Sequence, residues 1–204
     1  MTPEAPNTAF GHPLTLQRPA LCPEIALWLM AGEVDLERAC HTLDDCHPPP
    51  YWAFCWGAGQ ALARFVLDHP EIARARAVVD FGAGCGVVAI AAALAGASRV
   101  CAVDSDPAAR AVCLRNATAN GVTLSVSAGL PEEFDVLLAA DVLYEPGVPD
   151  RLREVRASGH AVYVADPGRA GSHDLGLPAL VRHAARTLPD VDSPMCTAAI
   201  FVLP

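Results

Sequence analysis

Hydrophobic and polar positions follow two periods along the chain, and from residue 77 onward the two alternate. Short apolar runs predict strands over residues 77–81, 99–103, 123–127, 135–140, 161–165 and 197–203. Apolar residues at helical spacing predict helices over residues 87–95, 107–120, 148–157 and 177–188. Strands and helices that alternate in this way form a mostly parallel sheet with helices on both faces.

The chain before residue 77 is less regular. We expect a loose lead-in over residues 1–20, short helices over 23–30 and 35–41, an extended stretch at Pro48–Pro50 and a helix over 60–67. The chain is therefore divided into a lead-in of residues 1–57, which packs over the ligand site, and one globular domain of residues 58–204.

Composition narrows the class of protein. The chain has 204 residues, of which 52% are hydrophobic, enough for one core. The longest apolar run, Val87 to Ala95, is too short to cross a membrane, and the N-terminus has no secretory signal pattern. The eight cysteines show no CxxC pair, and Cys40, Cys46 and His47 match no familiar zinc spacing. We expect a cytoplasmic, monomeric protein with reduced thiols, no metal and no membrane span.

The charged residues exclude several functions. All 14 basic residues are Arg, so a Schiff base, a pyridoxal-phosphate anchor and a P-loop lysine are impossible. The formal net charge of −9 at pH 7 opposes nonspecific nucleic-acid binding. Such a chain is better suited to a small molecule or to a basic patch on another protein.

A glycine-rich turn follows the strand predicted at residues 77–81. Gly82, Gly84 and Gly86 stand directly after Asp80 in the order Asp-x-Gly-x-Gly-x-Gly. Glycines let a backbone turn sharply and approach a ligand closely, as happens at the carboxyl ends of strands in such sheets. Position 87, where a dinucleotide motif has its third glycine, holds Val, so the turn differs from that motif.

Two carboxylates near this turn indicate the ligand. Asp104 ends the second strand, where it can accept both hydroxyls of a ribose, and Asp106 is better placed to cap the following helix. Asp80 would repel a pyrophosphate but attract an ammonium or a sulfonium. S-adenosylmethionine carries an adenosine, an ammonium and a sulfonium but no phosphate, and it fits these residues better than NAD does.

At this point the sequence resembles the class I, or seven-β-strand, S-adenosylmethionine-dependent methyltransferases. Within them it looks like the lysine methyltransferases that act on the β subunit of electron transfer flavoprotein. The resemblance covers about residues 19–204, and it depends on the glycine turn and on segments 23–25, 50–64, 104–107, 141–144 and 166–169. It implies an α/β fold, a Rossmann-like three-layer sandwich whose seven-stranded, mostly parallel sheet has an antiparallel last strand.

The resemblance also implies roles for individual residues. Asp80, Gly82, Gly84 and Gly86 would surround the methionine half of S-adenosylmethionine, Asp104 would bind its ribose, and Trp56 would line the cofactor site. Asp141 and Tyr144 occupy the position where many methyltransferases bind the substrate. Asp-Val-Leu-Tyr departs from the Asn/Asp-Pro-Pro-Tyr/Phe of enzymes that methylate amides or bases, which argues against such substrates. The resemblance implies a lysine-bearing protein as the partner.

Methyl transfer requires a neutral amine, and a lysine with a pKa of ~10.4 is mostly protonated at neutral pH. A carboxylate alone would raise that pKa, so Asp141 is assigned to capturing and aiming the amine, and Tyr144 to lining the methyl path. Trp52 suits core packing as well as it suits contact with a ligand. Residues 166–169 suit a simple turn as well as they suit shaping the pocket. The alternatives are a methyltransferase of a ribosomal protein or a small amine, a nicotinamide-dependent oxidoreductase and a non-catalytic S-adenosylmethionine-binding protein.

Overall fold

The computed structural model describes residues 5–32, 35, 49–169, 175–191 and 195–204. Its helices are α2 (Gly57–Asp68), α3 (Val87–Leu94), α4 (Pro107–Ala119) and α5 (Val148–Ala157), with short 3-10 helices η1 (Tyr51–Ala53) and η2 (Pro70–Ile72). The first strands are β1 (Thr8–Ala9), β2 (His12–Gln17) and β3 (Leu27–Met30). The later strands are β4 (Ala77–Phe81), β5 (Arg99–Val103), β6 (Ser125–Ser127), β7 (Val136–Ala140), β8 (Ala161–Asp166), β9 (Val181–Ala185) and β10 (Cys196–Val202).

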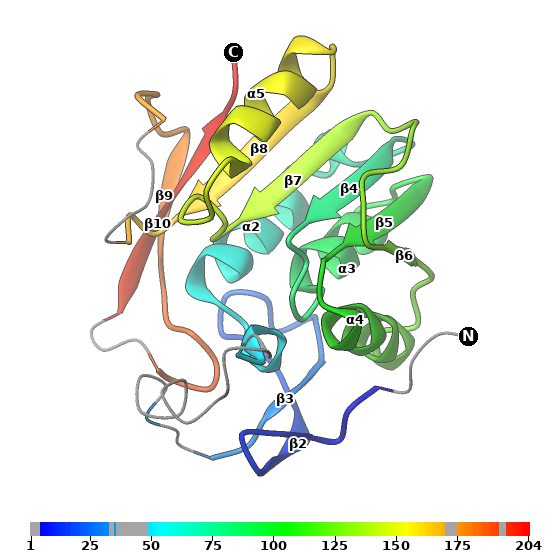
Figure 1. Ribbon diagram of the computed structural model, residues 1–204, viewed down its shortest axis with the longest axis vertical. Helices are drawn as coiled ribbons and strands as arrows, with labels where there is room; N and C mark the ends of the chain where they lie inside the picture. Colours follow the sequence, from blue (N-terminus) through cyan, green and yellow to red (C-terminus); the bar gives the residue numbers. More distant parts are fainter. Residues whose placement is uncertain (1–4, 33–34, 36–48, 170–174, 192–194) are drawn as a thin grey trace.

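Within the described residues, seven strands form one sheet in the order β6-β5-β4-β7-β8-β10-β9, and β1-β2-β3 form a smaller one (Figure 1). In the large sheet β10 runs antiparallel to both β8 and β9, whereas β6, β5, β4, β7 and β8 pair in parallel. The predicted fold class, with its antiparallel last strand, is confirmed.

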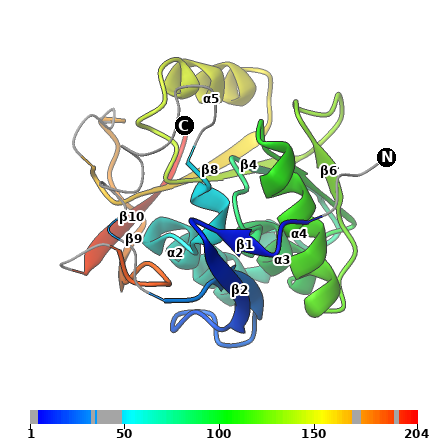
Figure 2. The same ribbon diagram turned by 60° about the horizontal axis from the view of Figure 1, so that its bottom comes forward.

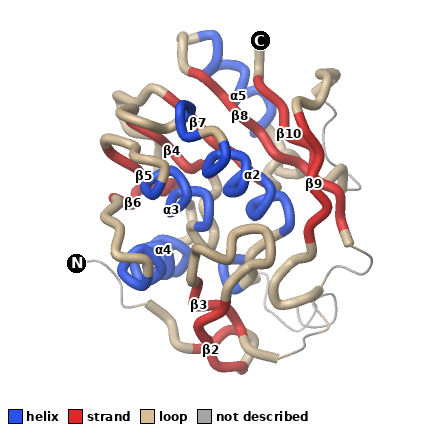
Figure 3. The backbone as a smooth tube through the Cα atoms, turned by 180° about the vertical axis from the view of Figure 1, so that it is seen from behind, coloured by secondary structure: helices blue, strands red, loops and turns tan. Residues whose placement is uncertain are grey.

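Side chains alternate along the strands, so each face of the large sheet carries its own core. Val78 and Leu138 pack with α2 and α3 on one face, whereas Val79 and Leu137 pack with Leu152 of α5 on the other. Figures 1 and 3 show α5 on the opposite face of the sheet from α2 and α3. Among the described helices, none has the length and apolar character needed to cross a bilayer.

The loose lead-in predicted over residues 1–20 is wrong at Thr8–Ala9 and His12–Gln17, which form β1 and β2. The helix predicted over residues 23–30 is also wrong, because Leu27–Met30 form β3. The run Ile25–Met30 is apolar at every position, so it carries no helical period and suits a buried strand equally well. β2 pairs with one edge of β3. The side-chain amides of Asn116 in α4 and of Asn120, which follows α4, bond the backbone beside its other edge. Figure 2 brings this end of the molecule forward, with β1 and β2 in front.

The helix predicted over residues 177–188 is also wrong, because Val181–Ala185 form β9 at the sheet edge. Leu177, Leu180 and Val181 fit helical spacing, but β9 pairs along its whole length with β10. Pairing with β10, the next strand along the chain, outweighed the helical spacing of the apolar residues. The other helices and strands predicted from residue 57 onward are confirmed within a few residues. The helix predicted at 35–41 lies outside the described residues except for Asp35.

Candidate active site

The glycine turn after β4 combines tight packing with one open position. Gly82, Gly84 and Gly86 all have positive φ angles, of 71°, 52° and 81°. A Cβ on Gly82 would lie 2.6 Å from Cγ1 of Val142, and one on Gly86 would lie 3.0 Å from Sγ of Cys113. A Cβ on Gly84 would meet nothing within 4 Å. The outer glycines are therefore needed for packing, and the turn is open to a ligand at Gly84.

Asp80 lies beneath this turn, where its side chain is 2% exposed. Its Oδ2 accepts a hydrogen bond of 2.9 Å from the backbone N–H of Ala89, in the first turn of α3. Burial raises the pKa of Asp80 to about 7, the Ala89 N–H opposes that rise, and the charge of Asp104 adds to it. Asp80 thus satisfies a backbone N–H in the first turn of α3. It also places a titratable group next to the glycine turn.

Asp104 joins the end of β5 to the glycine turn. Its Oδ2 accepts from the N–H of Gly84 and its Oδ1 from the N–H of Asp106, both at 2.9 Å. Burial is the largest of the causes that raise the pKa of Asp104. Asp106 caps α4 by accepting from Ala108 N–H at 2.7 Å, so the predicted capping role of Asp106 is confirmed. Each oxygen of Asp104 retains acceptor capacity for a hydroxyl donor.

Trp56 begins the segment that leads into α2. Its indole N–H donates to the carbonyl of Tyr51 at 3.0 Å, and its ring packs edge-on against Tyr51, with centroids 5.9 Å apart. The guanidinium carbon of Arg169 lies 5.0 Å from the centre of the Trp56 ring. Trp52, by contrast, is 5% exposed within a hydrophobic cluster, which supports a packing role for it.

Asp141 follows β7 directly and adopts a left-handed backbone conformation with a φ of 56°. Its side chain is 7% exposed and forms a two-pronged ion pair with Arg169. Nε of Arg169 donates to Oδ1, and a terminal nitrogen donates to Oδ2, both at 2.9 Å. The two turns lie at the same edge of the sheet because they follow neighbouring parallel strands, β7 and β8, but the pairing of the two residues was not predicted.

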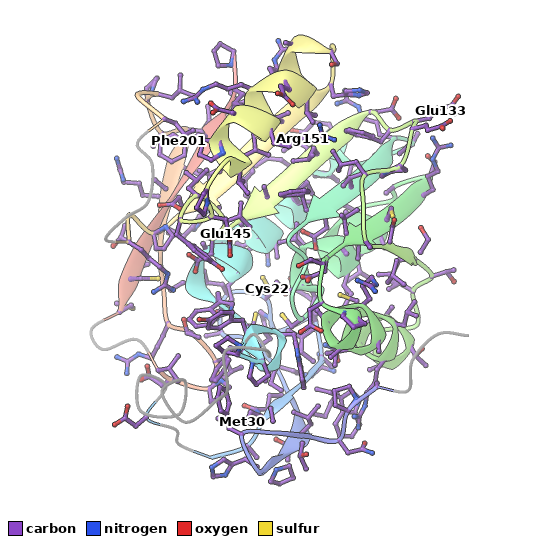
Figure 4. The ribbon with its side chains drawn as sticks, viewed as in Figure 1. Cys22, Met30, Glu133, Glu145, Arg151 and Phe201 are labelled. Atoms are coloured by element: carbon purple, nitrogen blue, oxygen red, sulfur yellow. The ribbon has the colours of Figure 1, made fainter. Side chains whose placement is uncertain are left out.

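Tyr144 lies three residues beyond Asp141 and is 42% exposed. Partial burial raises the pKa of its phenol to about 12, and the negative charges of Glu145 and Asp141 act in the same direction. The phenol therefore keeps its proton at neutral pH and can donate a hydrogen bond. Figure 4 labels Glu145 in the same turn, at the end of the sheet toward which β7 runs.

The turn at Asp166–Arg169 forms one wall of a groove beside β10. The groove has a volume of about 230 Å³ and is lined further by residues that include Leu143, Leu175, Arg182 and Phe201. Arg169 both lines this groove and pairs with Asp141, so the groove adjoins the Asp141–Arg169 pair. Figure 4 labels Phe201 on this part of the sheet.

Asn116 is a structural residue that the sequence analysis missed. It is completely buried in α4, its side-chain oxygen accepts from the N–H of Trp28 at 2.7 Å, and its side-chain nitrogen donates to the carbonyl of Cys85 at 2.8 Å. It therefore ties β3 to the glycine turn. The available signal was an Asn in the interior of a predicted helix, where that residue is otherwise unfavourable.

The chain is similar to known methyltransferases. The profile of the family Ribosomal protein L11 methyltransferase (PrmA) matches residues 60–148. The Electron transfer flavoprotein beta subunit lysine methyltransferase of Danio rerio is 39% identical over 70% of this chain and 60% of its own length. The same-named protein of Rattus norvegicus is 36% identical over 74% of this chain and 63% of its own length. The chain thus spans less than two thirds of these relatives.

Solved structures share the fold. The Pyrococcus abyssi tRNA (uracil-54, C5)-methyltransferase, in complex with S-adenosyl-L-homocysteine, aligns with a TM-score of 0.52 at 17% identity, over 71% of this chain and 38% of that one. TrmN from Thermus thermophilus aligns with a TM-score of 0.52 at 20% identity, over 74% of this chain and 51% of that one. With its strand order, its glycine turn and these relatives, the chain belongs to the class I S-adenosylmethionine-dependent methyltransferases.

Proposed function

We propose that the chain is an S-adenosylmethionine-dependent protein-lysine N-methyltransferase and that its substrate is the β subunit of electron transfer flavoprotein. The observation that carries the proposal is the identity of 35–39% to several vertebrate proteins that bear this name. The site supports it, since Asp141 and Tyr51 lie near enough to Tyr144 to act on its phenol, and both tyrosines are exposed. This grouping is suited to an extended, cationic side chain.

The residues around the glycine turn fit S-adenosylmethionine. The open position at Gly84 leaves room for the ligand, and Asp104 presents acceptors to the ribose hydroxyls. Asp80 has a pKa of about 7 and lies next to the turn where the cofactor would bind. The positive charge of S-adenosylmethionine would lower the pKa of Asp80 and favour its charged form. When bound, this cofactor supplies a methyl group on a sulfonium that departs as a neutral thioether.

The chain's own residues orient the acceptor. Asp141, fixed by Arg169, provides carboxylate lone pairs to which the substrate nitrogen can donate. Tyr144 keeps its proton at neutral pH, so it serves as a hydrogen-bond donor and a wall of the path, and it does not accept the proton of the lysine. Most of the acceleration comes from holding the amine in line with the methyl group and the sulfur. No acid is needed to protonate the leaving group, because it departs as a neutral thioether.

The test uses purified proteins and cofactor labelled on the methyl group. The chain is incubated with the electron transfer flavoprotein of its own host, and with ribosomes of that host in a parallel reaction. We expect label on the flavoprotein β subunit, recovered as methylated lysine after acid hydrolysis. Label on the ribosomal protein would favour the second candidate, which the family profile over residues 60–148 supports. Label on arginine or on small molecules would contradict lysine methylation.

The cofactor is tested separately by calorimetry. S-adenosylmethionine and S-adenosylhomocysteine should bind in a buffer that contains a metal chelator, and NAD should not. Binding of NAD alone would contradict the cofactor assignment. We further propose a monomer and a cytoplasmic location, the latter in keeping with the reduced thiols of Cys22, Cys55, Cys85, Cys101 and Cys113. Sedimentation and cell fractionation would test these two statements.

A further inference from the structure

The pairing of Asp141 with Arg169 bears on a problem that lysine methylation must solve. The two hydrogen bonds of 2.9 Å use both carboxylate oxygens and both prongs of the guanidinium, which fixes the plane of the carboxylate. The guanidinium carbon also lies 5.0 Å from the centre of the Trp56 ring. Arg169 therefore contacts both Asp141, which is predicted to bind the substrate, and Trp56, which is predicted to line the cofactor site.

The charge of the pair differs from the charge of Asp141 alone. A lysine with a pKa of ~10.4 must lose a proton to water before its lone pair can attack, and an unpaired carboxylate beside it would favour the protonated form. A guanidinium cannot lose its own proton in a protein, so Arg169 offsets the carboxylate at every working pH.

Other titratable groups lie near the pair on four segments. They are Tyr51 of η1, Tyr144 and Glu145 of the turn after β7, Asp166 at the end of β8, and Arg182 of β9. The phenol of Tyr144 is neutral at the working pH, and the carboxylate of Glu145 is exposed, so solvent screens its charge. Asp166 and Glu145 carry the same sign as Asp141, and Arg182 carries the same sign as Arg169. Of the two arginines, Arg169 is the one whose described contacts include Asp141.

We propose that Arg169 is a positioning residue that holds the carboxylate of Asp141 toward the substrate and offsets its charge, so that the lysine is aimed without being held as an ammonium. This rests on the proposed function. A substrate nitrogen that bonds the Asp141 carboxylate also lies near the Arg169 guanidinium, because Arg169 and Asp141 are in contact. At that range the positive charge of Arg169 lowers the pKa of the lysine strongly.

The first experiment is a pH profile of kcat for the wild type and Arg169→Gln, with the full chain and the purified flavoprotein, between pH 6.5 and 9.5. Without Arg169 the carboxylate retains the ammonium, so the acid limb of the profile should move up by roughly one to two pH units. The rate lost at pH 7 should be largely recovered at pH 9.5. A rate that falls equally at every pH would mean that Arg169 is only structural, and this would overturn the inference.

Three further variants separate charge from structure. Arg169→Lys keeps the charge and loses the fork, so kcat should fall while the acid limb stays in place. Arg169→Gln combined with Asp141→Asn removes both charges, so the limb should return toward its wild-type position. Arg153→Gln breaks an exposed Arg–Asp pair on α5, between Arg153 and Asp150 at 2.8 Å, and should leave the profile unchanged. A limb that stays shifted in the double variant would contradict the role of Asp141.

A binding measurement works without turnover and so separates this inference from the proposed function. n-Butylammonium, which mimics a lysine side chain, is titrated at pH 7 into each protein saturated with S-adenosylhomocysteine. Arg169→Gln should bind it at least ~10-fold more tightly than the wild type, and the added Asp141→Asn should abolish the gain. Equal affinities would overturn the inference, even if the flavoprotein proves to be the substrate. The expected gain would support the inference even if label goes to another lysine-bearing protein.

Discussion

Asp104 makes hydrogen bonds with both of its oxygens, to the N–H groups of Gly84 and Asp106. In Asp104→Asn one oxygen becomes an NH₂ group that faces one of these donors, and the ribose hydroxyls lose a charged acceptor. We predict that the affinity for S-adenosylmethionine falls roughly 10- to 100-fold, as expected for lost hydrogen bonds to a charged group. Calorimetry measures this, and Asp150→Asn on the exposed side of α5 should bind like the wild type. An unchanged affinity in Asp104→Asn would contradict the assignment.

Asp80 makes the stability depend on pH. Burial raises its pKa to about 7 in the folded chain, whereas an unfolded Asp titrates near ~3.9. The folded state therefore binds the proton more tightly, and this residue lowers the free energy of unfolding as pH rises from ~4 to ~7, by an amount on the order of a few kcal/mol. Above that range its contribution is constant.

The matched variant is Asp80→Asn, which cannot charge. Its free energy of unfolding, minus that of the wild type, should increase between pH 5 and pH 7 and then level off, as measured by urea denaturation in the absence of cofactor. Titrations elsewhere in the chain occur in both proteins and cancel in this difference. Parallel curves for the two proteins would mean that Asp80 does not titrate in this range.

At the residue scale, the sequence predicted local features of the site but not its side-chain pairs between distant residues. The glycine turn and the cap at Asp106 could be predicted because each depends on neighbours within a few residues, and Asp104 because it directly follows a predicted strand. The pairing of Asp141 with Arg169 and the links made by Asn116 join residues separated by 28 and by up to 88 positions. Side-chain partners at such distances depend on strand order, which local pattern does not encode.

Helix α2 begins close against the edge of the large sheet. A Cβ on Gly57 would overlap Sγ of Cys196 and lie 3.3 Å from Cβ of Ala185. We predict that Gly57→Ala lowers the free energy of unfolding by roughly 1–3 kcal/mol, which chemical denaturation would measure. Adding Cys196→Ala should recover most of that loss, because it removes the overlapping sulfur. A loss that persists in the double variant would place its cause elsewhere.

At the scale of elements, the order of strands and helices from β4 to β8 was predictable and β3 and β9 were not. The run Ile25–Met30 has no period at all, and residues 177–188 have a helical period. Each segment became a strand because a neighbour offered backbone or side-chain partners: β2 and α4 for β3, and β10 for β9. Such partners outweigh local preference, which spans only ~1 kcal/mol for strands.

The charge of the whole molecule affects how it would meet the proposed protein substrate. The net charge is −9 at pH 7, and every cation is an Arg. A lysine-bearing surface should therefore be attracted over long range, and salt should screen that attraction. We predict that KM for the protein substrate rises at least ~3-fold between 50 and 300 mM salt. The value of kcat should be nearly unchanged, since contacts at the site are short. Steady-state kinetics across that range measures both, and a constant KM would contradict electrostatic attraction.

The link through Asn116 also has a consequence for the order of synthesis. Trp28 leaves the ribosome 88 residues before the side chain that accepts its N–H. At ~5–20 residues per second, that interval is about 4 to 18 s. Until α4 is made, the apolar run Ile25–Met30 presents an open edge of the kind that pairs with strands of other chains. Chains that stop before Pro107 should therefore collect in the insoluble fraction, and translation pauses upstream of α4 should increase the demand for chaperones.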